Sequence, residues 1–128
     1  MATSDTRQSA LQLDSLDRLH WVGIVAALVT AGIHLLLGVR FAPAPLGISF
    51  LLAGLGFLGA IVLVLLEYHR RTVYLVGIPF TALQILLWYY YNFVAGPYSF
   101  PAEVGPLGAI DKVAQLLLIA VLVVLLRR

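Results

Sequence analysis

Four long apolar runs fill most of this 128-residue chain, and they constrain its fold more than any other feature. Each run is close to the roughly 20 residues that a helix needs to cross a hydrocarbon core about 30 Å thick. Within two of them, residues 51–66 and 116–126 include no polar side chain that could face water. Soluble helices need such a face, so the sequence predicts a protein whose solvent is lipid. The predicted spans are residues 19–39, 46–66, 73–94 and 107–126.

The composition predicts one membrane domain, residues 1–128, and leaves no segment for a water-soluble domain. Hydrophobic residues make up 62% of the chain and charged residues 11%, far from soluble usage. The polar leader, residues 1–17, precedes a run that is too long for the apolar region of a secretion signal. The chain has no cysteine, which excludes disulfides, thiolate metal sites and thiol catalysis.

The distribution of basic residues predicts the orientation of the spans. One side of the membrane would carry Arg7, Arg18, Arg70, Arg71, Arg127 and Arg128, and the other side only Arg40 and Lys112. The positive-inside rule then places both termini in the cytoplasm. The links are short, so we expect an all-α, antiparallel four-transmembrane-helix bundle that passes the cell membrane several times. Because the basic residues serve topology, we expect no nucleic-acid partner.

Small residues recur at helical spacing within the spans. In lipid, helices associate through close packing of small residues and through polar contacts, so such positions mark the interior of a bundle. The second span illustrates the pattern, because Ser49, Ala53, Gly56 and Ala60 follow one another at intervals of three or four residues. The helix-packing residues that we predict are Gly23, Ala27, Ala31, Gly56, Ala60 and Gly77.

A group of polar residues lies deep within the predicted spans. At a rise of about 1.5 Å per residue, His34 lies about 22 Å from Leu19, and Asp111 lies about 22 Å from Leu126. Both positions fall in the predicted outer half of the membrane. An ionisable side chain there is costly unless it is paired, so we expect His34 and Asp111 to pair inside the bundle. The full predicted cluster is His34, Asp111, Gln115, Gln84 and Trp88.

Three interpretations of this cluster stay open. It could be a satisfied hydrogen-bond network that fixes the register of the bundle and has no further role. It could be a proton or ion pathway, because a histidine beside a carboxylate titrates near physiological pH. It could also belong to a pocket for a lipid or quinone, since aromatic side chains follow Trp88 at residues 89–91 and 93. For Tyr89 and Tyr90, an interfacial aromatic belt is the better explanation.

Two further histidines, His20 and His69, fall near the predicted cytoplasmic surface on neighbouring helices. Axial haem ligation by such a pair is chemically feasible. The segment around His69, residues 67–71, is more simply interpreted as a solvated helix end whose arginines meet anionic lipid headgroups. The three histidines of the chain lie at such different depths that they cannot share one ion, so we expect no metal and no resident cofactor.

The segments LDSLDRLHWVGIVAALVTAGIHLLLG, GFLGAIVLVLLEYHRR and DKVAQLLLIAVLVVLLRR resemble small four-span membrane proteins of unknown function from halophilic archaea. The resemblance covers most of the chain and implies the same fold, without a function to transfer.

The sequence has no nucleophile elbow, phosphate-binding loop or metalloprotease spacing, and we predict a protein that is not an enzyme. The favoured function is an accessory or oligomer-forming subunit, whose partners are membrane lipids and other membrane helices. The alternatives are a small homo-oligomeric transporter or channel that uses His34 and Asp111, and a lipid- or quinone-binding protein.

Overall fold

The structure, a computed structural model, describes residues 13–128 and is all-helical over that part of the chain. Most of the predicted leader, residues 1–12 with Arg7, lies outside the described residues. A 3-10 turn η1 (Leu13–Ser15) precedes four long helices. These are α2 (Arg18–Phe41), α3 (Pro45–Leu65), α4 (Arg70–Tyr89), which continues into the π-helical turn η2 (Tyr90–Val94), and α5 (Pro106–Arg127).

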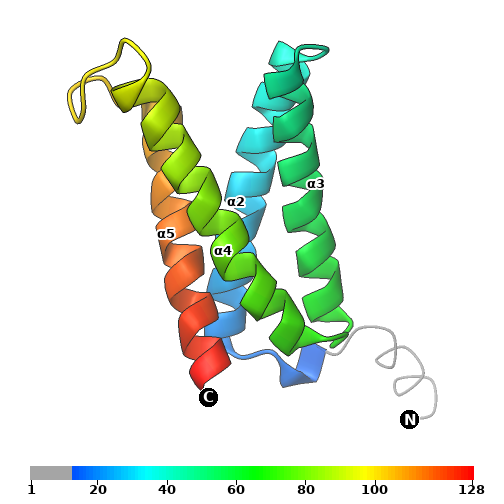
Figure 1. The fold of residues 1–128 in the computed structure, drawn as a ribbon. Coiled ribbons are helices and arrows are strands. Elements are labelled where there is room, and N and C mark those ends of the chain that lie inside the picture. Colours follow the sequence, from blue (N-terminus) through cyan, green and yellow to red (C-terminus); the bar gives the residue numbers. More distant parts are fainter. Residues whose placement is uncertain (1–12) are drawn as a thin grey trace.

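Each of these four helices is long and apolar enough to cross a membrane, and the helices alternate in direction (Figure 1). The predicted fold class is thus confirmed, and the chain is a multi-pass membrane protein. The predicted spans agree closely with the helices because hydropathy alone marks where a chain can leave water.

Local sequence signals set the helix ends. Asp17 caps α2 by accepting from the backbone N–H of His20, whose side chain in turn contacts the backbone of Asp17, so the two residues form a capping box. Helices α3 and α5 both start with a proline, Pro45 and Pro106, at the position where a missing N–H costs nothing.

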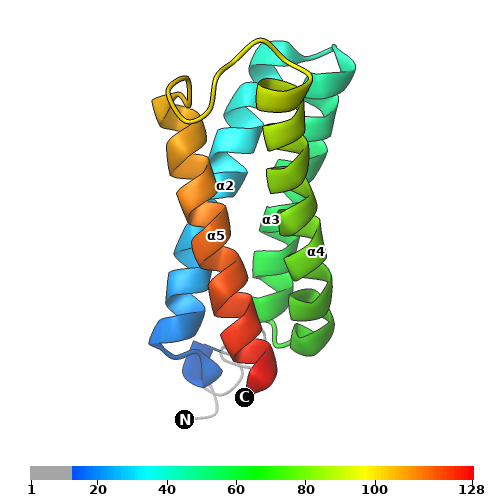
Figure 2. The same cartoon turned by 60° about the vertical axis from the view of Figure 1, so that its left-hand side comes forward.

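The helices are arranged so that α2 packs along both α3 and α5, and α4 packs along α5. Helices α3 and α4 approach each other near the turn at residues 66–69 and separate toward the opposite end (Figure 1). We call the end with this turn the terminal end, because Arg128 donates a hydrogen bond to Asp17 there at 2.6 Å, and the C-terminus lies beside the start of α2 (Figure 2). The opposite end, with residues 42–44 and 95–105, is the loop end.

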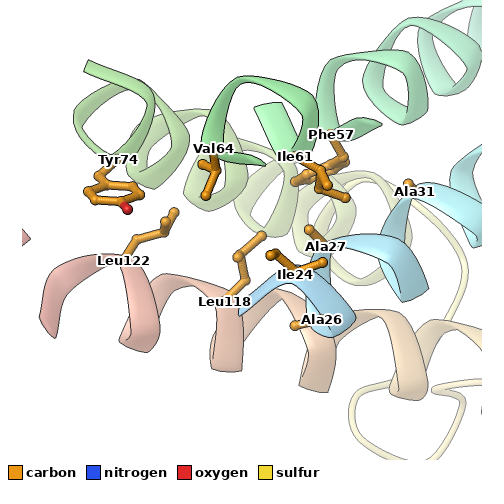
Figure 3. Close-up of a cluster of buried hydrophobic side chains, with 10 residues drawn as sticks. All are labelled: Ile24, Ala26, Ala27, Ala31, Phe57, Ile61, Val64, Tyr74, Leu118 and Leu122. Atoms are coloured by element: carbon orange, nitrogen blue, oxygen red, sulfur yellow. The ribbon is translucent and has the colours of Figure 1, made fainter. Parts of the chain in front are cut away.

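The hydrophobic core lies between α2, α3 and α5, with Tyr74 of α4 at one end, and its side chains point toward one another (Figure 3). Small residues on α2 allow this close packing, and Ala31 is fully buried. A Cβ atom added at Gly54 of α3 would lie 2.7 Å from Cγ of Leu35 of α2. The two helices therefore approach each other so closely there that only a glycine fits without a shift. The main members of the core are Ile24, Ala27, Phe57, Ile61, Leu118 and Leu122.

The face that α3 turns toward α2 differs from the small-residue stripe that the sequence suggested. The buried residues of α3 are Gly47, Gly54, Phe57, Ile61 and Val64. Gly56 is exposed and Ala60 is half-buried, and both lie on the neighbouring face, toward α4. The reason is physical: α3 has two stripes of small residues, and the bulky Phe57 and Ile61 bury more apolar surface when the Gly54 side meets α2.

Candidate functional site

Two helices position a buried polar cluster in the half of the bundle nearer the loop end. Thr30 and His34 lie one turn apart on α2, and Asp111 and Gln115 lie one turn apart on α5. All four side chains are buried, and Thr30 and Gln115 are completely inaccessible. Because residues four apart share one face of a helix, each pair points at the other across the α2/α5 contact.

The Asp111 carboxylate is the centre of this cluster. Its Oδ1 accepts a hydrogen bond from the Thr30 hydroxyl at 2.5 Å, and its Oδ2 accepts one from the Lys112 ammonium at 2.6 Å. The Lys112 side chain is 12% exposed, so the two opposite charges compensate each other in a nearly dry environment. The carboxylate therefore has both a neutral and a charged donor.

His34 joins the cluster mainly through Thr30. Its Nδ1 lies 2.8 Å from the backbone oxygen of Thr30, and because a carbonyl only accepts, Nδ1 carries the proton. The same nitrogen is 3.7 Å from Oδ1 of Asp111, longer than a hydrogen bond. The predicted His34/Asp111 pair is thus present as neighbours, with the Thr30 hydroxyl between them. The imidazole ring packs against Phe50 and Phe57 of α3.

Lys112 extends the cluster toward α4. Its ammonium donates to Oε1 of Gln115 at 2.8 Å, and Nε2 of Gln115 donates to Oε1 of Gln84 at 3.0 Å. The ammonium also lies 5.2 Å from the ring centre of Trp88, a cation–π distance. The structure thus brings together all five predicted residues, and Trp88 takes part through its ring face.

Sequence reasoning missed two members of the cluster, Thr30 and Lys112. The signal for Thr30 was its place one turn before His34 on the same helix face. Lys112 was assigned to topology alone, although a lysine directly after an intramembrane aspartate is a ready counter-ion. Its long side chain lies along α5, so its ammonium donates to both Asp111 and Gln115 of the same helix.

The two histidines considered for haem serve other contacts. Nδ1 of His20 lies 2.8 Å from Oδ1 of Asp17 at the start of α2. His69 is exposed, has a positive φ of 51° in the turn before α4, and packs edge-on against Tyr68. Among residues 13–128, no group of three His, Cys, Asp or Glu side chains is placed to hold a metal ion.

The predicted packing residues divide among several helix contacts. Gly23, Ala27 and Ala31 are buried on α2, and a Cβ at Gly23 would lie 3.0 Å from Val121 of α5. Gly77 of α4 comes equally close to Leu122 of α5. Gly56 and Ala60 line the space between α3 and α4, and a Cβ at Gly56 would lie 3.1 Å from the Phe80 ring.

The sequence matches DUF7475, a family of unknown function, over residues 5–126. The chain belongs to this family. No curated protein and no solved structure matches it. Any function must therefore be argued from the arrangement itself.

Chemically, the cluster of this DUF7475 protein links three helices through groups that donate, accept or carry charge. The carboxylate of Asp111 and the ammonium of Lys112 form an ion pair, and the amides of Gln115 and Gln84 pass the connection to α4. Such a network holds helices together in lipid, because its members find no better partners there. It also concentrates ionisable groups at one depth, which a proton pathway would need.

Proposed function

We propose that this protein is a non-enzymatic membrane subunit that binds a further transmembrane helix, supplied by a second copy of the chain. The observation that carries the proposal is an apolar groove of about 670 Å³ on the outside of the bundle, between α2 and α5. All of its lining residues are apolar, and they include Val25, Ala26, Val29, Ala109, Val113 and Ala114.

The shape of the groove suits a helix. Alanines at positions 26, 109 and 114 line it, while the exposed side chains of Val25 and Val113 are available to interdigitate with a partner. In lipid, small residues favour association because they let a second backbone approach closely. A two-fold symmetric contact brings the same patch of both copies together, and this patch offers both small residues and projecting valines to its copy.

The polar cluster supports this proposal by fixing the geometry of the groove. Thr30 of α2 and Asp111 of α5 are hydrogen-bonded inside the bundle, and their sequence neighbours Val29 and Ile110 line the groove outside. A network that holds α2 and α5 at one spacing therefore also sets the width of the surface between them. The cluster then has a structural role that serves assembly.

The test compares two tryptophan variants at valines of similar exposure. Val113 lines the groove and is 65% exposed, whereas Val76 on α4 is 59% exposed and lies outside it. We expect the wild type and Val76→Trp to form oligomers in mild detergent and in liposomes, and Val113→Trp to shift toward monomers. Multi-angle light scattering and single-molecule bleaching measure this shift. A monomeric wild type, or an equally oligomeric Val113→Trp, contradicts the proposal.

A proton or ion pathway is the second candidate, supported by the three ionisable groups His34, Asp111 and Lys112 at one depth. In that case, liposomes with the wild type would show a proton or ion flux, and Asp111→Asn would abolish it. Absence of flux in the wild type, or flux that persists in Asp111→Asn, rejects the pathway.

We also propose that the terminal end faces the cytoplasm, as the arginine distribution indicates. The chain has no cysteine, so single cysteines can report the orientation without background. Asp14 and Glu103 are exposed at opposite ends of the bundle. In intact cells, a membrane-impermeant maleimide should label Glu103→Cys and leave Asp14→Cys unlabelled. The reverse pattern would invert the topology.

A further inference from the structure

A second cavity lies inside the bundle, nearer the terminal end than the polar cluster. Its volume is about 70 Å³, and residues of all four long helices line it. This space is several times what a single water needs. Most of the lining is apolar, for example Ile24, Ile61 and Leu118.

Two hydroxyl groups in the lining of this cavity have no hydrogen-bond partner in the described part of the chain. They are Oγ1 of Thr81 and the phenol oxygen of Tyr74, both on α4. Thr81 is fully buried, and Tyr74 is 7% exposed. The Tyr74 ring lies over Leu122, at one end of the apolar cluster (Figure 3). Buried hydroxyls are normally hydrogen-bonded, so two unpartnered ones in one cavity indicate a missing partner.

The side of the cavity that is nearest the lipid lies between α3 and α4. Its lining residues on α2 and α5, such as Ile24 and Leu118, are buried. Two exposed residues of the lining are Gly56 of α3 and Phe80 of α4, which face each other across the seam where these helices separate. The Phe80 ring also packs edge-on against Phe57, at 5.3 Å between ring centres. A ligand dissolved in the bilayer would therefore enter the cavity sideways, past the Phe80 ring, without passing through water.

We propose that this cavity binds a single-chain lipid that carries a hydroxyl or carbonyl oxygen, and that at least one of Tyr74 and Thr81 donates a hydrogen bond to that oxygen. The apolar walls accept the chain, and the hydroxyls select molecules with an oxygen over pure hydrocarbon. Water is the weaker occupant, because a bound water needs two to four polar partners and this lining is almost entirely apolar. The site is independent of the α2/α5 groove and of the polar cluster.

The experiment distinguishes an acyl chain from an isoprenoid chain. Oleyl alcohol, geranylgeraniol and octadecane are titrated into the purified protein in mild detergent, and binding is followed by native mass spectrometry. We expect one or both alcohols to bind at least about five-fold more tightly than octadecane, the ratio that one ordinary hydrogen bond supports. The stronger of the two alcohols identifies the chain type.

Two variants that remove only an oxygen atom assign the contact. Tyr74→Phe and Thr81→Val keep the shape of the lining, and their matched controls are Tyr68→Phe and Thr72→Val at exposed positions. We expect at least one lining variant to reduce the preference for an alcohol over octadecane about five-fold, while both controls keep it. Ala60→Leu, which narrows the cavity, should weaken binding of every chain, whereas Ala82→Leu outside the lining should not.

Circular dichroism and thermal melting show whether each variant is folded. Removing an unpartnered buried hydroxyl does not unfold a protein, so both lining variants should melt at or above the wild-type temperature without ligand. Equal binding of the alcohols and octadecane, absence of binding by all three, or an unchanged preference in both lining variants would overturn the proposal. None of these outcomes depends on the oligomeric state, so this test is separate from that of the groove.

Discussion

The polar cluster and the inner cavity of this bundle differ in how fully their buried polar groups are hydrogen-bonded. Near the loop end, Asp111 is held by Thr30 and Lys112, and an amide bridge reaches α4 through Gln115. In the inner cavity, the hydroxyls of Tyr74, nearer the terminal end, and of Thr81, near the middle of α4, have no partner in the described residues. The same helix, α4, contributes Gln84 to the network, where its Oε1 accepts a hydrogen bond and its buried Nε2 has no partner in the described residues. It also contributes the two unpartnered hydroxyls to the cavity.

The difference follows from which helices meet. The network forms where α2 and α5 are packed along their length, so donors and acceptors from both come within reach. The cavity lies where α3 and α4 part and cannot close over the Thr81 side of α4. In lipid, a separated seam is filled by hydrocarbon at no cost, but hydrocarbon offers nothing to a hydroxyl. Where two helices pack tightly, their polar groups can therefore find partners within the protein. Where two helices separate, a bound ligand can supply the missing partner.

Breaking the network should have the largest effect. Asp111→Ala leaves the Lys112 ammonium and the Thr30 hydroxyl without their acceptor in a buried site, and we expect a loss of about 3 kcal/mol in stability. Thermal or denaturant unfolding in detergent measures it. His34→Ala should cost less, because His34 contacts Asp111 mainly through Thr30.

The double variant of His34 and Asp111 sharpens the same test. Residues that share one network lose less together than the sum of their separate losses. Strict additivity would show that Thr30 does not couple them. The pair Asp111→Asn and Lys112→Gln removes both charges at once, and it should recover part of the stability that Asp111→Ala loses.

The next effect concerns the tight seam between α2 and α3. A Cβ at Gly54 would lie 2.7 Å from Cγ of Leu35 and 3.1 Å from the carbonyl oxygen of Ala31, so Gly54→Ala should destabilise the protein by about 2 kcal/mol. Gly59 on the same helix has open space around its added Cβ. Gly59→Ala should stay within about 0.5 kcal/mol of the wild type in thermal unfolding. Equal losses would mean that α3 faces α2 with another side.

The smallest effect belongs to the terminal end. The hydrogen bond from Arg128, together with the backbone N–H of His20, holds the pKa of the Asp17 carboxyl well below its usual range. A lowered carboxyl pKa adds stability that is fully present above the unfolded value of about 3.9 and is lost as the pH falls toward the folded value. Asp17→Asn keeps a capping side chain but removes the charge. Its melting temperature should therefore lie slightly below that of the wild type at pH 7, and the gap should close in acid.

High salt should also narrow the gap between the wild type and Asp17→Asn, because the Asp17–Arg128 pair is accessible to solvent. The Lys112–Asp111 pair is nearly dry and should respond much less to salt. Asp14→Asn, a change of the same kind three residues earlier, is the control. A gap that widens in acid would mean that the carboxylate of Asp17 destabilises the fold.

Hydropathy was enough to predict the fold of this chain. Long apolar runs have one stable form in lipid, so the predicted spans and the helices agree closely. The face of α3 was harder to predict, because both the Gly54 side and the Gly56 side are lined with small residues. Apolar bulk decided between them: Phe57 and Ile61 lie on the Gly54 side and fill the contact with α2. Small-residue spacing shows that a helix has partners, but not which side meets which partner.

The polar cluster was predictable in part for a related reason. His34 and Asp111 stood out because intramembrane ionisable residues need partners, and depth placed them together. Thr30 was missed because a threonine is common in spans and becomes a bridge only when a carboxylate lies opposite. The orphaned hydroxyls of Tyr74 and Thr81 could not be predicted at all. Whether these hydroxyls find a partner depends on the angle at which α3 crosses α4, and no local sequence pattern determines that angle.

The salt bridge between Asp17 and Arg128 makes it possible to change the order of the helices along the chain. Because Nη1 of Arg128, after α5, lies 2.6 Å from Oδ2 of Asp17, before α2, a short linker from Arg128 to Leu13 can join the two segments. New ends can then be opened within residues 95–105. Such a circularly permuted chain starts with α5 and keeps every helix contact, yet its termini lie on the opposite side of the membrane from the arginine-rich turn. The orientation that this permuted chain adopts in the membrane would show whether the first helix or the arginine-rich turn decides the topology.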